Sequence, residues 1–440
     1  MLTPLRNSTY RHLFAAQIIS LLGTGLTTVA LALLAYDLAG DKAGIVLGAA
    51  LAIKMIAYVS IAPIVGGLAA SLPRKKLLVI LDIIRAGFVL CLPFVEEIWQ
   101  IYLIIFLMQS CSAGFTPMLQ ATILDIIPDE STYTKALSLS RLAYDLESLV
   151  SPMLAATALL FMSFNVLFAF NALAFLISAL IVVTALLPKR KIAQEVRIVS
   201  AWEKITFGVR AYLATPILRG LLSLSMAVSA AGSIVIVNTV VIVRSGFGLG
   251  EQEVALAWAV YGGGSMLVAL TLPKLLQHLP DRPLMLAGAA LLAAGLLAGS
   301  FVSTFFWLLP VWFLLGSATS LINTPSGRLL RRSSAEEDRP AYFAAQFSLS
   351  HACWLLTYPL AGWLGVTLGI TETFYVFSAI VSMSFVTALY LWPHQEQIAL
   401  MHIHQNINPD HPHLNDAEVV QGGYQHKHDY VIDHHHRTWP

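Results

Sequence analysis

The last part of the chain is rich in histidine, and the spacing of those histidines suits metal binding. Ten of the thirteen histidines stand at or after position 394, and three pairs have one residue between their members. Neutral imidazole is the usual nitrogen ligand for Ni(II), Co(II), Zn(II) and Cu(II), and closely spaced histidines in a flexible segment can wrap around such an ion. We therefore expect the tail to bind one of these ions. The candidate ligands are His402, His404, His411, His413, His426, His428, His434, His435 and His436.

The composition of this tail, residues 394–440, argues against a packed core. Asn, Asp, Gly and Gln are mixed with the histidines, so we expect a disordered segment. Two simpler readings compete with metal binding: an expression tag, and a soluble tail that binds nothing. Only three histidines are consecutive, and the residues from Arg437 to Pro440 follow them, which is unlike a designed tag. The repeated His-x-His spacing favours metal binding.

Charged side chains inside apolar runs form a second set of candidates. Lys54 has no other charge within four residues, and a lone charge at the centre of a membrane costs roughly 2.5 to 3.5 kcal/mol on insertion scales. Arg141 and Asp145 are four residues apart and can pair on one helix, which leaves Glu147 without a local partner. These groups either change partner or protonation during a transport cycle or form structural ion pairs. As a hypothesis, Glu147 or Asp145 meets Lys54 across two helices, or binds a cation or proton in transit.

A line of hydrogen-bonding side chains marks one side of a predicted apolar helix. Its members follow the spacing i, i+3, i+7 and i+11, and they are Gln109, Ser112, Thr116 and Gln120. A polar stripe in a membrane must face protein or water, so it predicts a pathway wall. Further candidates for the wall are Gln17, Thr24, Ser317, Ser320, Asn323, Thr324 and His351. The alternative is that the Ser and Thr side chains only pack helices or bond to carbonyls of their own helix.

The elements that carry these residues are predicted to be transmembrane helices. Hydrophobic residues make up 57% of the 440 residues and charged residues 12%, and the mean hydropathy is +0.73. The composition predicts an all-α polytopic membrane protein with about twelve spans of the ~20 residues that a bilayer requires. The spans are 13–36, 44–69, 76–95, 98–123, 137–160, 164–187, 217–243, 252–276, 283–302, 305–327, 341–366 and 370–392.

The second half of the sequence repeats the first. Trp99, Thr116 and Pro117 recur 208 positions later as Trp307, Thr324 and Pro325. A parallel duplication of a six-helix unit explains this offset. We therefore divide the chain into a six-helix half at 1–187, a basic cytoplasmic linker at 188–212, a second six-helix half at 213–393, and the tail at 394–440.

Lysine and arginine positions predict the orientation. They gather in alternate loops, and the opposite side has only Lys42 and Arg244. By the positive-inside rule we expect both termini in the cytoplasm, and we expect a multi-pass protein of a bacterial plasma (inner) membrane. A net charge of +1 gives no reason to expect nucleic acid as a partner. No motif of a hydrolase or metalloprotease is present, so we expect neither an enzyme nor a required cofactor.

Twelve spans, a basic central loop and a 6+6 duplication resemble the major facilitator superfamily. Its loop signature after the second helix is partly present in Gly66, Arg74 and Lys75, whereas Ser71 and Pro73 replace the usual charged residue and glycine. The resemblance implies a cytoplasmic gate there, and we assign to it Gly66, Arg74, Lys75, Asp82 and Arg85. The membrane-embedded arginine that proton-coupled drug exporters carry in their fourth helix is absent between Trp99 and Thr122.

A narrower resemblance concerns the cargo. The opening from Thr3 to Phe14, the stretch from Leu137 to Asp145 and the histidine-rich tail are similar to bacterial nickel-resistance permeases of the NreB type. This similarity implies efflux of Ni(II) or Co(II) by proton antiport, with metal resistance as the outcome and the tail as a collector. The alternatives are a multidrug, macrolide or siderophore exporter, and a metal-sensing membrane protein without transport. The expected partners are membrane lipid, protons, and a divalent metal ion or small molecule, with the protein as a monomer.

Overall fold

The computed structural model describes most of the chain at the level of individual residues. The residues outside its described part are 1–2, 69–73, 128, 130–131, 133–135, 137–138, 141–142, 144–146, 148–149, 152–153, 156, 187–200, 277–278, 335–338, 394–398, 405–417, 421–422, 430–431 and 433–440. For some further residues in helices and strands only the backbone is described.

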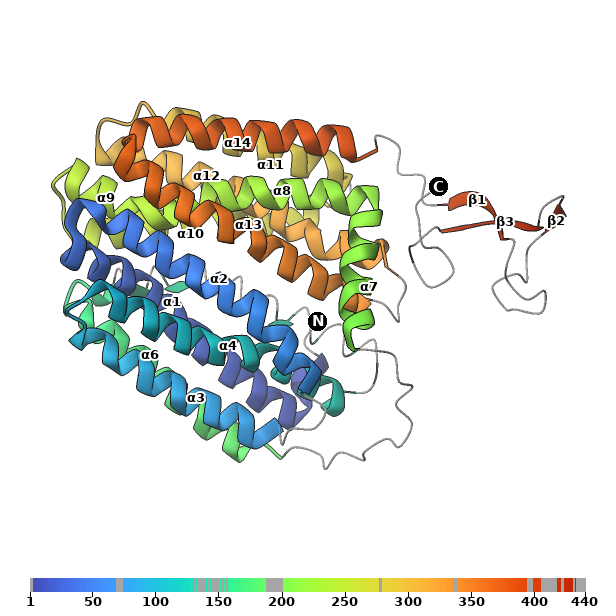
Figure 1. The fold of residues 1–440 in the computed structure, drawn as a ribbon, viewed down its shortest axis with the longest axis horizontal. Coiled ribbons are helices and arrows are strands. Elements are labelled where there is room, and N and C mark those ends of the chain that lie inside the picture. The colour runs from blue at the N-terminus through green and yellow to red at the C-terminus, as the bar shows by residue number, and fades with distance from the viewer. Residues whose placement is uncertain are drawn as a thin grey trace.

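The amino-terminal half is a bundle of long helices joined by short turns (Figure 1). Its helices are α1 (Ser8–Ala39), α2 (Ala43–Leu68), α3 (Arg74–Cys91), α4 (Ile98–Ile126) and α6 (Asn165–Thr184), with short 3-10 turns at Thr3–Arg6, Gly40–Lys42 and Leu92–Phe94. Local signals explain two of the helix starts. The Asn7 side chain accepts a hydrogen bond from the backbone amide of Tyr10 at the start of α1, and Glu97 and Gln100 form a capping box at the start of α4.

The carboxy-terminal half continues with α8 (Pro216–Ser233), α9 (Thr239–Val241), α10 (Glu251–Leu275), α11 (Asp281–Gly299), α12 (Phe305–Arg332), α13 (Arg339–Thr367) and α14 (Ile370–Leu391). Two π-helical segments, Ile234–Asn238 and Ile242–Gly246, flank α9, so that Pro216 to Gly246 is one helical rod. Pro216 in the first turn starts this rod, because proline lacks the amide hydrogen that a first turn leaves unbonded.

The predicted spans coincide with these helices. Within the described part of the chain, nine helical segments are long and apolar enough to cross a membrane, with α1 and α2 counted as one segment. Half of the predicted span 137–160 lies outside that part, but its described residues up to Ala158 are helical. The expectation of an all-α polytopic membrane protein is confirmed for the membrane region.

The two halves repeat the same helix packing, as the sequence repeat predicts. In the first half α4 packs against α2 and α3, and in the second α12 packs against α10 and α11. The paired tryptophans also correspond: Trp99 is 60% exposed in the first turn of α4, and Trp307 is 67% exposed in the first turn of α12. Exposed tryptophans at helix starts fit the boundary between lipid and water.

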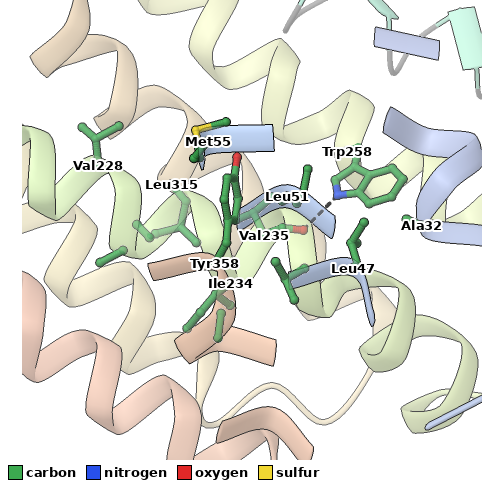
Figure 2. Packing of buried hydrophobic residues seen from close by; sticks show 14 of the residues in the cluster. Ala32, Leu47, Leu51, Met55, Val228, Ile234, Val235, Trp258, Leu315 and Tyr358 are labelled. Carbon is green, nitrogen blue, oxygen red and sulfur yellow. Dashed lines mark hydrogen bonds between the residues drawn. The ribbon is translucent and has the colours of Figure 1, made fainter. Parts of the chain in front are cut away.

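Helices α2 and α13 form the main contact between the halves. In Figure 2, Leu47, Leu51 and Met55 of α2 meet Tyr358 of α13 and the rod around Val235. The indole nitrogen of Trp258 donates a hydrogen bond to the Val235 carbonyl at 2.9 Å. This apolar cluster is continuous across both halves, so burial of apolar surface holds them together.

We call the end of the bundle at which α1 begins and α14 ends the terminal end, and the opposite end the far end (Figure 1). Helix α7 (Ala201–Ala214) lies at the terminal end, within the segment that we predicted as a linker. The amino-terminal half begins and ends at this end, which is why its last helix can lead to α7 without crossing the membrane again.

The tail differs from the disordered segment that we expected. It contains a three-stranded antiparallel sheet of β1 (Ala399–His404), β2 (Glu418–Val420) and β3 (Gly423–Asp429), in the order β1-β3-β2. Short strands in a polar sequence can satisfy the hydrogen bonds of their backbone groups by pairing with each other, and this pairing does not require an apolar core. Beyond the sheet, Ile432 is 2% exposed and its carbonyl accepts a hydrogen bond from the Tyr342 hydroxyl of α13 at 2.7 Å.

Candidate functional site

A small cavity inside the amino-terminal half collects several of the predicted pathway residues. Its volume is about 10 Å³, which is the size that holds about one water molecule. Helices α1, α2 and α4 supply its walls, and the polar residues in them are Thr24, Thr27, Thr28, Lys54 and Gln109. The structure therefore brings Thr24, Lys54 and Gln109 together from three different helices.

Lys54 and Glu147 lie close enough for their charges to interact. The hypothesis from the sequence was that Lys54 meets either Glu147 or Asp145. Glu147 packs against α1, since a Cβ on Gly25 would be 3.3 Å from its Cγ atom. The Lys54 ammonium is also 5.7 Å from the ring centre of Tyr58, one turn along α2. Attraction to a carboxylate and to an aromatic face offsets part of the cost of holding an ammonium in this region.

Tyr58 connects this charged pair to the other half. Its ring meets the ring of His351 on α13 edge-on, with centroids 5.6 Å apart. His351 also stacks on Phe347 at 3.9 Å, and its Nδ1 atom is 2.7 Å from the Phe347 carbonyl oxygen. His351 therefore stands at the contact between the halves. The sequence did not single out Tyr58, because its position beside both Lys54 and His351 depends on how α2 and α13 pack.

Gln109 is the amide in the cavity wall whose hydrogen bonding is incomplete. The residue is 4% exposed, and its Oε1 atom is buried and has no hydrogen-bond partner among the described residues. An unsatisfied buried acceptor costs about 1 to 3 kcal/mol, so such a group is kept where a ligand or ion pairs with it. A bound cation, proton carrier or water in the cavity would supply that partner.

Other polar residues of the predicted wall are already bonded within the protein. The Gln17 amide oxygen accepts a hydrogen bond from Ser140 at 3.0 Å, and Thr24 donates to the Ser20 carbonyl of its own helix at 2.9 Å. Ser112 donates to the Met108 carbonyl and faces Arg85 at 3.5 Å. Gln17 and Ser112 are therefore bonded as the helix-packing interpretation expects, and their role in a pathway wall stays a prediction.

The corresponding polar residues on α12 fall into two groups. The Ser317 hydroxyl oxygen is buried without a partner and lies at the contact with α10, where a Cβ on Gly264 would be 2.9 Å from it. Ser320 and Thr324 have their hydroxyl oxygens 3.3 Å apart, and Asn323 is partly exposed on the same helix. Ser317 therefore serves the helix contact, whereas Ser320, Asn323 and Thr324 form a short polar group in the second half.

Asp82 and Arg85 form an ion pair in the interior of the amino-terminal half. Asp82 is fully buried and also accepts a hydrogen bond from Ser178 of α6 at 2.7 Å. The Arg85 guanidinium lies between the rings of Phe115 and Phe175, at 4.3 and 4.4 Å from their centres. All of these partners belong to α3, α4 and α6, so the pair joins helices of one half, and its assignment to the cytoplasmic gate stays a prediction.

The remaining gate residues lie where α2 ends and α3 begins. Gly66 is part of the last turn of α2, Arg74 is the first residue of α3, and the Lys75 ammonium donates to the Ala185 carbonyl at 2.9 Å. The side chain of Arg74 is outside the described part of the structure. Lys75 therefore ties the start of α3 to the end of α6 at the terminal end.

A second charged cluster lies at the terminal end, among residues that we did not predict as site residues. Asp281, the first residue of α11, is 1% exposed and accepts hydrogen bonds from Arg328 and Arg332 of α12. Arg282 donates to the Leu389 and Trp392 carbonyls at the end of α14, both at 3.2 Å. The acid at the start of α11 was visible in the sequence, but its partners lie 47 and 51 positions away and are set by helix packing.

The hydrogen bonds that join described residues of the two halves gather at the far end. Ser245 donates to the Asp41 carboxylate and its hydroxyl oxygen is 3.1 Å from that of Tyr36. The Arg244 guanidinium stacks over the Tyr36 ring at 4.6 Å, and Gln252 donates to the Leu159 carbonyl at 3.3 Å. Arg244 stood out in the sequence as an isolated charge, but the sequence did not indicate which residues it meets.

Several predicted residues cannot be placed as side chains. Asp145, His411, His413 and His434 to His436 lie outside the described residues, and the side chains of Thr116 and Gln120 do too. For the tail sheet the backbone register is described: His402 pairs with His426, Leu400 with His428, and His404 with Tyr424. Because residues directly opposite and those two apart share a face of a sheet, these four histidine positions belong to one face.

The described side chains contain no group of three His, Cys, Asp or Glu residues that could hold a metal ion. Among the described residues, the cavity wall supplies the Lys54 ammonium and the Gln109 amide, and the Glu147 carboxylate interacts electrostatically with Lys54. Such a set can exchange a proton or cation against the lysine, but it does not enclose a metal by itself.

Known proteins share this sequence pattern and fold. The sequence profile of the Major Facilitator Superfamily matches residues 13–240 and 221–400. YfiS of Bacillus subtilis strain 168, an uncharacterised transporter of this type, is 26% identical over 373 residues, which cover 81% of this chain and 87% of YfiS.

Solved structures of other transporters are similar in fold. The nucleoside transporter NupG superimposes with a TM-score of 0.69 at 15% identity, covering 87% of this chain and all (100%) of the NupG chain. A bacterial homologue of the human lysosomal transporter Spinster, in an inward-facing and occupied conformation, gives a TM-score of 0.69 at 12% identity over 88% of this chain and 97% of its own. The profile match, the YfiS relationship and the repeated bundle of apolar helices agree: this chain belongs to the Major Facilitator Superfamily and is a multi-pass membrane transporter, not an enzyme.

Proposed function

We propose that this transporter exports Ni(II) or Co(II) by alternating access, in exchange for protons, and so confers metal resistance. The observation that carries the proposal is the interaction of Glu147 with Lys54 beside a cavity of ionic size. A carboxylate binds either a proton or a divalent cation well, but not both at once. Alternation between these ligands couples their movements in opposite directions.

Lys54 gives this exchange a return step. When neither metal nor proton occupies Glu147, the nearby ammonium compensates its charge, so the empty carrier does not hold an isolated carboxylate in the membrane. A divalent cation at Glu147 repels that ammonium, and Tyr58 offers it an aromatic face 5.7 Å away. The cargo therefore competes with a cation that the protein itself supplies.

The arrangement of the halves fits a conformation closed at the far end. The hydrogen bonds of Ser245 with Asp41 and Tyr36 join the halves there, and the described contacts at the terminal end, such as Lys75 with Ala185, stay within one half. If the terminal end faces the cytoplasm of a bacterial inner membrane, as the basic residues predict, the site would receive cargo from the cytoplasm.

The histidine-rich tail would act as a collector at that mouth. Its sheet places His402 and His426 opposite each other, with His404 and His428 on the same face, which favours binding of one ion by several imidazoles. The contact between Ile432 and Tyr342 ties the tail to α13 at the terminal end. Tethering raises the local metal concentration at the mouth, and this need not change turnover at saturation.

Flux in reconstituted vesicles tests the proposal most directly. Purified full-length protein in vesicles with an imposed proton gradient should move Ni(II) or Co(II), and dissipating the gradient should abolish uptake against a concentration difference. A panel of organic dyes and drugs in the same vesicles provides the comparison. Metal flux that does not depend on the proton gradient would contradict the antiport mechanism. Absence of metal flux would contradict the assignment of Ni(II) or Co(II) as the cargo.

A second candidate is an exporter of organic molecules such as drugs, macrolides or siderophores. It is favoured by the absence, among the described side chains, of any group of three metal-binding residues. In this case the vesicles would move an organic compound irrespective of nickel, and the tail would have a separate regulatory role. A metal sensor without transport predicts metal binding by the tail but no flux of either class.

A further inference from the structure

A groove on the outer side of the carboxy-terminal half is separate from the cavity near Lys54. Its volume is about 520 Å³, within the ~300–1,000 Å³ typical of ligand sites. Helices α8, α13 and α14 enclose it, and Figure 1 shows α8 running between the other two. Most of its lining is apolar, with Leu222, Met226, Leu349, Leu356, Ile380 and Met383 as the large side chains.

The groove opens toward the surrounding bilayer and does not require water. Leu356 and Met383 in its walls are 64% and 67% exposed, which identifies a face that lipid covers in a membrane. Two of its hydroxyl groups are already satisfied: Ser223 donates to the Arg219 carbonyl and Ser384 to the Ile380 carbonyl. The lining is therefore suited to a hydrocarbon chain.

A cation stands at one end of this groove. Arg219 precedes Leu222, Ser223 and Met226 by three, four and seven residues, so it lies on the same side of α8, nearer to the terminal end. Its Nε atom is buried and has no hydrogen-bond partner among the described residues. A buried guanidinium nitrogen without an acceptor is costly, and a phosphate oxygen would supply the missing acceptor.

We propose that this groove is a binding site for an anionic phospholipid of the leaflet at the terminal end, with an acyl chain between α8, α13 and α14 and the headgroup phosphate on Arg219. The combination selects an amphiphile: the groove alone takes any acyl chain, and Arg219 adds preference for negative charge. The face of α13 that carries Leu349 and Leu356 differs from the face that meets Tyr58 of α2. The lipid would therefore lie on one side of α13, and Lys54 and Glu147 lie beyond its other side.

Native mass spectrometry of the purified full-length protein, titrated with phosphatidylglycerol and separately with phosphatidylcholine, tests this site. Wild-type protein should bind phosphatidylglycerol more tightly, and Arg219→Gln should reduce that affinity about fivefold, the effect of one basic side chain on an anionic lipid. Phosphatidylcholine binding should not change. Arg210→Gln, at an exposed position of α7 at the same end, is the matched control and should leave both affinities unchanged.

A second variant tests the groove independently of the charge. Ala352→Trp would fill the groove from α13 and should reduce binding of phosphatidylglycerol even with Arg219 intact. Equal effects of Arg219→Gln and Arg210→Gln would overturn the headgroup assignment, and unchanged binding in Ala352→Trp would overturn the acyl site. Wild-type protein that binds both lipids equally would show that the groove holds ordinary boundary lipid only, against the proposal.

Discussion

Gly362 on α13 lies against Gly44 on α2, and a Cβ atom on Gly362 would be 2.1 Å from the Gly44 carbonyl oxygen. The obstacle is backbone, so a larger residue can fit only if one helix moves. This close approach belongs to the same interface as the far-end hydrogen bonds of Ser245 with Asp41 and Tyr36. Contact between the halves thus depends on the absence of a side chain, as it does where membrane helices pack closely.

We expect Gly362→Ala to separate the halves at the far end. Cysteines introduced at positions 41 and 245, in a protein without its native cysteines, report this contact through the yield of disulfide cross-linking. The yield should fall several-fold in Gly362→Ala. Gly263→Ala is the control, because no atom lies within 4 Å of a Cβ added at that helical position. An unchanged yield in Gly362→Ala would show that the backbone contact does not hold the halves together.

Lys54→Ala and Glu147→Gln should each reduce transport at least tenfold in reconstituted vesicles, because each removes one partner of the exchange near the cavity. Lys54→Arg keeps the charge and should retain measurable flux. Glu96→Gln, at an exposed acid outside the helices, is the matched control. Wild-type flux in both Lys54→Ala and Glu147→Gln would end the proposal that this pair couples transport.

Two buried glutamines should respond in different ways to leucine. Gln109→Leu removes an acceptor that has no partner, so thermal stability in detergent should not fall while flux should fall. Gln17→Leu removes the acceptor of the Ser140 hydroxyl and should lower the free energy of unfolding by about 1 kcal/mol, with a smaller effect on flux. Loss of stability in Gln109→Leu would indicate that Gln109 is a packing residue after all.

The ion pair of Asp82 and Arg85 should matter for stability more than for gating. Arg85→Leu leaves a fully buried carboxylate without its cation and should destabilise the protein by about 3 to 5 kcal/mol, measured by denaturation in detergent. Replacing both residues by leucine should be less harmful than replacing Arg85 alone. If Arg85→Leu is as stable as wild type but transports poorly, the pair acts in transport and not mainly in stability.

The role of the tail can be separated from its attachment. Deleting residues 394–440 should lower tolerance to nickel while leaving some transport, because the collector is lost but the membrane site remains. Replacing the tail histidines by alanine should have the same effect. Tyr342→Phe keeps every tail histidine and removes the hydroxyl that donates to the Ile432 carbonyl, so it should reduce tolerance less. If deletion changes neither metal binding nor tolerance, the metal assignment loses its main support.

Much of the fold could be predicted from hydropathy, because a bilayer demands long apolar helices with few charges. The spans, the duplication and the corresponding tryptophans Trp99 and Trp307 were all visible in the sequence. The polar stripe was harder to interpret, since spacing shows that Gln109 and Ser112 share a side of α4 but does not say what that side meets. In the structure, Gln109 lines the cavity and Ser112 faces Arg85.

The tail and the half-to-half contacts show where prediction from one sequence ends. Composition indicated that the tail could not form a core, but pairing of His402 with His426 depends on long-range register. Likewise, nothing local to Asp41 or Ser245 indicates that they meet across 204 positions. Such contacts depend on the docking of whole helices, for which short-range spacing carries no information.

The sequence by itself determined that the chain forms long apolar helices and which polar and charged groups those helices contain, because these follow from hydropathy and residue chemistry. Only the tertiary structure decided which of those groups meet. It brought Lys54 near Glu147 and Tyr58, placed Asp82 and Arg85 inside one half, and arranged α8, α13 and α14 around an apolar groove. The physical reason is that neighbours across helices are fixed by side-chain packing over the whole bundle, which no local spacing encodes.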